Sequence, residues 1–181
     1  MKKGMMVLLV VLISACHKGK NNPEACNGNT RRELKVAIDD KISLVNFTPV
    51  FSTIDSIGNI TVPEVDKETP RQNVEMQVYT VRAKVDKLKK ERDGDYHIRL
   101  IDNNENYLIC ESANPGCSYA EQSNYLNQFK TVRDFIKVNE DHLEGQYVTI
   151  TGIAFIDIDH HYARKQAKNN MELHPILEIS Y

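Results

Sequence analysis

Three segments of this 181-residue chain place a histidine close to a carboxylate. Each contributes one acidic residue and one histidine to a candidate cluster, which comprises Asp95, His97, Asp157, His160, Glu172 and His174. Imidazole together with carboxylate suits a zinc, manganese or nickel ion, and the same groups perform general acid–base catalysis. If the three segments converge in space, we expect either a metal or ligand site or a site of proton transfer.

A structural interpretation of the same residues remains open. His97 can hydrogen-bond to a neighbouring strand, and Glu172 can pair with His174 beneath a loop. The sequence contains no His-Glu-x-x-His pattern, phosphate-binding glycine loop or nucleophile elbow. Asp93-Gly94-Asp95 echoes a calcium loop but lacks the twelve-residue spacing with its terminal glutamate. The sequence therefore requires no cofactor, and a divalent metal remains possible beside a structural polar network and ligand binding without catalysis.

Alternating apolar residues predict the strands that would position these segments. Five are expected, at residues 74–88, 96–101, 107–110, 146–158 and 171–180. The first is long, with a change of apolar phase and an expected bulge near Tyr79-Thr80. An amphipathic helix is expected at about 120–138, with Phe129 and Phe135 on one apolar face that closes an end of the sheet.

This order of three strands, a helix and two strands is the wiring of an OB-fold barrel. The predicted fold class is therefore mainly β, with a five-stranded OB-like barrel over 74–181 and one helix between its third and fourth strands. Residues 31–73 contain short apolar clusters and a Pro-rich loop, and we expect them to form an N-terminal extension that packs on the barrel.

The amino end has the features of an export signal. Lys2 and Lys3 precede an apolar run over 5–13 and the small pair Ser14-Ala15. The nine apolar residues are too few for a permanent membrane span, which needs about 20. Ile13-Ser14-Ala15-Cys16, with Leu12 ahead of it, resembles the lipobox of bacterial prolipoproteins. That resemblance implies removal of a signal peptide at 1–15 and attachment of acyl chains such as palmitate to Cys16.

The segment at 16–30 is polar and predicts a flexible tether that spans about 20 Å. His17 occupies the position where many lipoproteins of the inner membrane carry aspartate, which favours the outer membrane over the inner one. Removal of 1–15 takes away Lys2 and Lys3 and no acidic residue, so the net charge falls from −2 to −4. This charge argues against a nucleic-acid partner.

Three further cysteines enter an oxidising compartment with the exported chain. A disulfide between Cys26 and Cys117 is favoured because both lie in turn-rich segments, and Cys110–Cys117 is the alternative. Cys110 belongs to an apolar run and is expected to behave as a small buried hydrophobic residue.

The same segments resemble a family of uncharacterised secreted bacterial proteins. The likeness rests on three stretches, at 89–97, 151–160 and 170–177, which contain Asp-Gly-Asp-x-His, Thr-Gly-x-x-Phe-x-Asp-x-x-His and Glu-Leu-His-Pro. His161 stands where that pattern has a small residue, and the glycine before Met171 is missing. The resemblance runs from about Cys26 to the end and supports the fold more than any activity.

These observations favour a noncatalytic, membrane-anchored lipoprotein of the cell envelope. Its OB-like domain would bind a small ligand, a glycan or a partner protein. The alternative is a metal-dependent hydrolase, such as a nuclease, that uses the histidine–carboxylate cluster.

The anchor is tested by the substitution Cys16→Ser, which removes the sulfur that would carry the acyl chains. We expect the variant to leave the membrane fraction or to accumulate unprocessed, because a single polar tether cannot hold a domain on a bilayer. Membrane fractionation after a high-salt wash measures this. A processed variant that stays membrane-bound would contradict lipid anchoring through Cys16.

Overall fold

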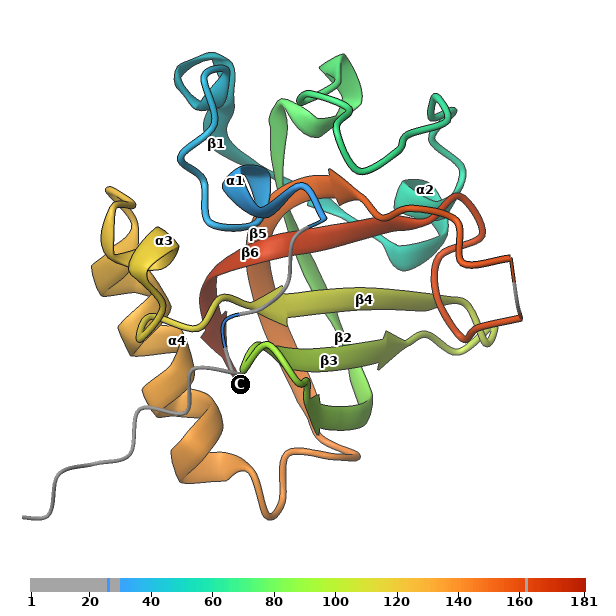
Figure 1. Ribbon diagram of the computed structural model, residues 1–181. Helices are drawn as coiled ribbons and strands as arrows, with labels where there is room; N and C mark the ends of the chain where they lie inside the picture. Colours follow the sequence, from blue (N-terminus) through green and yellow to red (C-terminus); the bar gives the residue numbers. More distant parts are fainter. Residues whose placement is uncertain (1–25, 27–29, 162) are drawn as a thin grey trace, which may run out of the picture.

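The computed structural model describes Cys26 and residues 30–161 and 163–181, and Figure 1 shows their arrangement. The predicted signal peptide at 1–15, the predicted lipidation site Cys16 and most of the predicted tether lie outside these residues. An N-terminal extension comes first, with α1 (Arg32–Lys35), η2 (Ile42–Leu44), β1 (Asn46–Ser52), α2 (Ile54–Gly58) and η3 (Asn73–Glu75). The elements that follow are β2 (Gln77–Lys90), β3 (Tyr96–Ile101), β4 (Tyr107–Ser112), α3 (Ser118–Glu121), α4 (Leu126–Asn139), β5 (Tyr147–Ile156) and β6 (Met171–Ser180).

Strands β2 to β6 close into the predicted barrel. The strand order is β2-β3-β4-β6-β5, and an additional pairing of β2 with β5 completes the circle. All of these pairs are antiparallel except β4 with β6, which is parallel, and β1 adds a sixth strand parallel to β2. The mainly β fold with five OB-like barrel strands, and with α4 between the third and fourth of them, is therefore confirmed.

β2 is long because its two halves pair with different strands. Val78 to Lys84 lie opposite β5, and Lys84 to Lys90 lie opposite β3. The register shift falls between Val85 and Lys87, not at the predicted position near Tyr79-Thr80. The change of apolar phase near Tyr79-Thr80 has another cause. Val78 packs on the outer side with the extension, whereas Val81 belongs to the barrel core.

The predicted helix at 120–138 is two helices, α3 and α4. The residues between them are polar, and the Ser123 hydroxyl oxygen accepts a hydrogen bond from the Tyr125 backbone N–H at 3.2 Å. Such local bonds compete with helical ones and interrupt a helix. Val132 and Ile136 of α4 enter the barrel core, whereas Phe129 packs in a separate buried cluster beside α3. Phe129 and Phe135 therefore do not share the face that closes the barrel.

Gly152 allows β5 and β6 to approach closely just where β6 enters the candidate site. A Cβ atom at this position would lie 2.9 Å from the Leu173 Cβ atom and 3.1 Å from the Pro175 carbonyl oxygen. Side chains are not accommodated at such distances, so the glycine fixes the spacing of the two strands. The register between β5 and β6 shifts on either side of Gly152. His174 lies on the segment of β6 that this approach positions.

A disulfide joins Cys26 to Cys117, with 5.6 Å between their Cα atoms, and confirms the favoured pairing. Cys110 is a free thiol buried in the barrel core. Among the helices in the described part of the chain, none has the length and apolar character needed to cross a membrane.

Candidate functional site

A buried ion pair holds the extension against the barrel. Arg31, the residue before α1, faces Glu75 with its Nη2 atom 2.6 Å and its Nη1 atom 2.8 Å from the two carboxylate oxygens. Both side chains are fully buried. Arg31 also donates to the Ile156 carbonyl oxygen at 2.7 Å, and the Ile156 backbone N–H donates to Glu75 at 2.8 Å. The pair thus joins the start of α1 and the end of η3 to the last residue of β5.

The centre of the candidate site is Glu111 on β4. β3 and β4 pair with His97 directly opposite Glu111, and the His97 Nδ1 atom lies 3.0 Å from Glu111 Oε1. The parallel register of β4 and β6, with Cys110 opposite Leu173, brings His174 to the other side of Glu111. Its Nδ1 atom lies 3.0 Å from Glu111 Oε2, and its Nε2 atom lies 3.6 Å from Asp95 Oδ2.

Two cations of α1 lie over these carboxylates. The Lys35 Nζ atom is 3.7 Å from Glu111 Oε2. The guanidinium of Arg32 is 3.5 Å from Asp95 and 3.1 Å from Asp93. Burial alone would raise the pKa of Glu111, but His174, His97 and Lys35 outweigh it and hold that pKa well below its usual range. Glu111 is therefore a carboxylate at neutral pH.

The remaining candidates form a second group at the end of β5. Asp157 Oδ2 lies 3.0 Å from His160 Nε2 and 3.2 Å from Arg164 Nη1. Glu172 is fully buried, and its burial, followed by the negative charges of Asp157 and Glu111, raises its pKa well above the usual range. The structure thus brings Asp95, His97 and His174 together around Glu111, places Asp157 with His160 beside Arg164, and leaves Glu172 between the two groups.

Two residues of the loop before β6, His161 and Asn170, differ from the pattern of the resembled family, and both have a left-handed backbone conformation. Asn170 has a φ angle of 59° and His161 one of 55°. Asparagine tolerates this conformation better than most residues, which explains how it can replace a glycine there. Asn170 also accepts a hydrogen bond from the Asp157 backbone N–H at 2.9 Å, so the turn still positions Asp157.

Sequence reasoning missed Glu111, Lys35, Arg32 and Arg164. The predicted third strand ended at Cys110, one residue before Glu111, so the carboxylate was not assigned to a strand. If the pairing of the two strands is continued outward from the turn between β3 and β4, Glu111 falls opposite His97. The α1 cations had no comparable signal, because only the tertiary fold brings them to the barrel.

Three of these groups meet the spacing of a metal site. Asp95, Glu111 and His174 each offer a ligand atom, and these atoms all lie within 4.8 Å of one another. His97, Asp157, His160 and Glu172 were also predicted as possible ligands, and the described residues do not place them in this group. Asp95 directly precedes β3, whereas Glu111 lies in β4 and His174 in β6.

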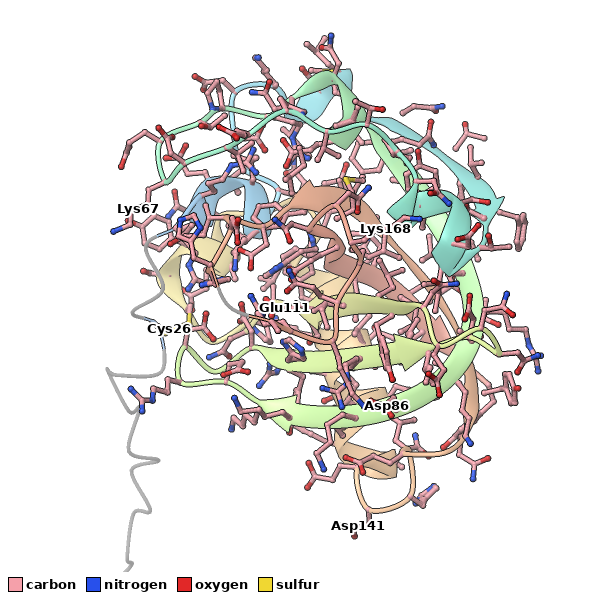
Figure 2. The ribbon with its side chains drawn as sticks, turned by 90° about the vertical axis from the view of Figure 1, so that its right-hand side faces the viewer. Cys26, Lys67, Asp86, Glu111, Asp141 and Lys168 are labelled. Atoms are coloured by element: carbon pink, nitrogen blue, oxygen red, sulfur yellow. A yellow bond between two sulfur atoms is a disulfide. The ribbon has the colours of Figure 1, made fainter. Side chains whose placement is uncertain are left out.

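A broad groove of about 1670 Å³ opens above the cluster. Its walls come from the ends of β2 and β3, the turn between them, α1 and the loop after β5. Figure 2 shows Glu111 near the middle of this side of the molecule, whereas Lys67 and Asp141 lie at its periphery. Nine lining residues are basic: Arg32, Lys35, Lys87, Lys89, Lys90, Arg92, Arg99, Arg164 and Lys165. Four are acidic: Glu91, Asp93, Glu111 and Asp157.

Comparisons with known proteins identify similar solved structures but no family. No family model and no curated protein matches the chain. A putative aspartyl-tRNA synthetase from Leishmania major Friedlin is 12% identical, with a TM-score of 0.45, and the match covers 76% of this chain and 21% of that one. The asparaginyl-tRNA synthetase of Entamoeba histolytica is 12% identical, with a TM-score of 0.38, over 57% of this chain and 20% of that one.

A third similar structure is the OBody AM3L09 bound to hen egg-white lysozyme. It is 13% identical, with a TM-score of 0.40, over 59% of this chain and 82% of that one. The present chain spans about a fifth of the length of the two synthetases.

The ion pair that positions α1 is tested by Glu75→Gln. The substitution preserves shape but leaves the Arg31 charge buried without its partner, so we expect a loss of about 3–5 kcal/mol in the free energy of unfolding. Glu144→Gln is the matched control. It removes a carboxylate from the exposed pair with Lys87 and should cost at most about 1 kcal/mol. Denaturant unfolding measures both, and equal losses would contradict the role given to Glu75.

Proposed function

We propose that this protein is a lipid-anchored binding protein of the cell envelope whose OB-like barrel holds an anionic ligand in the groove above Glu111. The observation that carries the proposal is the charge of the groove. Nine basic and four acidic residues line it, although the whole chain has a net charge of −2. A concave surface with an excess of charge of one sign concentrates ligands of the opposite sign.

The basic residues of the groove lie either on its floor or on its rim. Those on the floor, Arg32 and Lys35, are held by carboxylates of the cluster. Of the others, Arg99 and Arg164 are half-buried and pair with Asp86 and Asp157, whereas the four rim lysines and Arg92 are exposed. Two of these lysines lie near tyrosine rings. Lys90 Nζ lies 6.0 Å from the centre of the Tyr96 ring, and Lys165 Nζ lies 5.1 Å from that of Tyr107. Lys90 comes from the end of β2 and Lys165 from the loop after β5, so separate elements contribute the positive charge of the rim.

The anchor follows from the signal and lipobox features of the first sixteen residues. The disulfide of Cys26 with Cys117 begins the folded domain ten residues after Cys16. A tether of that length spans about 17 Å on average. A ligand taken by this groove would therefore be one found within a short distance of the membrane surface.

The alternative of a metal-dependent hydrolase requires a metal-bound water that reaches the substrate. Of the three residues with metal-site spacing, Glu111 borders the groove, but Asp95 and His174 are completely buried. This burial favours the binding role over hydrolysis.

The charge of the groove is tested by the double variant Lys90→Glu with Lys165→Glu. The probe is fluorescein-labelled heparin, a sulfated polyanion, with neutral dextran as the comparison, and the whole chain is held in a nonionic detergent. We expect the dissociation constant for heparin to rise about tenfold or more at low salt. Each reversal removes an attractive contact and adds a repulsive one, and about 1.4 kcal/mol corresponds to a factor of ten.

Lys130→Glu with Lys168→Glu is the matched control, because it makes the same change in charge at two exposed lysines outside the groove. Binding that weakens equally in both double variants would show a nonspecific charge effect and contradict the proposal. Failure of the wild-type chain to prefer heparin over dextran would also contradict it.

A further inference from the structure

His174 is completely buried and has unused hydrogen-bonding capacity. Neither of its ring nitrogens makes a hydrogen bond of suitable length and direction within the part of the chain that the structure describes. Glu111 Oε2 approaches Nδ1 to 3.0 Å without the direction of a hydrogen bond, and Asp95 Oδ2 is 3.6 Å from Nε2, which is too long for one. Buried polar groups in native proteins nearly always have a partner, so this imidazole calls for one.

Each of the two carboxylates beside His174 has one oxygen positioned by a partner other than a cation. Asp95 Oδ1 accepts the Asn114 backbone N–H at 2.7 Å, and Glu111 Oε1 lies 3.0 Å from His97 Nδ1. The other oxygen of each, Oδ2 and Oε2, faces His174 and also has a cation of α1 nearby, Arg32 Nη1 at 3.5 Å from Oδ2 and Lys35 Nζ at 3.7 Å from Oε2. Outer contacts of this kind orient the carboxylates that ligate metals in proteins.

We propose that Asp95, Glu111 and His174 bind one divalent transition-metal ion of the zinc class at the junction of β3, β4 and β6. One imidazole and two carboxylates suit such an ion, whereas calcium and magnesium take six or more oxygens. Ligand atoms at about 2.1 Å from a common ion lie at most about 4.2 Å apart. The three atoms lie within 4.8 Å of one another, so small inward movements of the side chains complete the site.

The neighbouring cations can accommodate the added charge. Lys35 lies 3.7 Å from Glu111, and its charge also interacts with that of Asp157. Arg32 keeps its closer contact with Asp93. A metal binds neutral imidazole, so any proton on the ligating nitrogen leaves to solvent as the metal–nitrogen bond forms. The site requires no ligand in the groove and does not depend on the proposed function.

Zinc is the probe that tests this site. The whole chain is purified in nonionic detergent, stripped with a chelator and titrated with zinc at pH 7.5 by calorimetry, with magnesium as the comparison. We expect one zinc ion per chain, no comparable binding of magnesium, and a melting temperature that rises with the free zinc concentration. Absence of zinc binding would overturn the proposal.

Variants assign the ion to its residues. Glu111→Gln and His174→Gln should each weaken zinc binding by more than about 100-fold, which is beyond the loss expected from an outer contact. His161→Gln is the control, because His161 is an exposed histidine beside Asp159 and should leave the affinity unchanged. Loss of binding in His161→Gln with retention in Glu111→Gln would place the ion on the surface and refute the site.

X-ray absorption spectroscopy of the zinc-loaded wild-type chain identifies the zinc ligands even if a variant at a buried residue does not fold. The proposed site predicts one imidazole among oxygen ligands. Two or more imidazoles, or a sulfur ligand such as the buried thiol of Cys110, would contradict it.

Discussion

The buried pair of Arg31 and Glu75 is the interaction on which the arrangement of the groove depends. Both side chains are fully buried, so their charges have lost their hydration. Two direct contacts between the side chains and hydrogen bonds to the backbone of Ile156 compensate that loss. The pair does more than link two segments, because it places the cations of α1 over the barrel wall. Without α1 in this position, the groove would lack one of its walls.

The extension also determines which face of β6 is buried. In a simple barrel one face of each strand meets the core and the other meets water. Here the six residues from Met171 to Ile176 are all buried. Leu173 faces the barrel core, whereas His174 lies on the other face with Phe155, 5.6 Å between their rings. The Arg31 guanidinium lies 5.0 Å from the centre of the same Phe155 ring. The extension therefore converts a solvent-facing strand surface into a buried polar layer at the floor of the groove.

Local sequence pattern accounts for the barrel better than for the site. Alternation gave the five strands and their order because each strand buries one face against a single core. The disulfide of Cys26 with Cys117 followed from turn composition. Glu111 was missed because polar residues at strand ends carry no periodic signal. Lys35 was missed because α1 has only four residues and reaches the barrel through contacts with Glu75, which lies far along the chain.

The central claim is that the groove above Glu111 is the binding face of this protein. It is tested most directly by amide chemical shifts in the NMR spectrum of the labelled chain during titration with a short heparin-derived oligosaccharide. The account predicts that the shifts concentrate at the end of β2, in the turn at 91–94 and in the loop at 157–165. Shifts confined to β1 or to the exposed face of α4, with the groove unchanged, would contradict it.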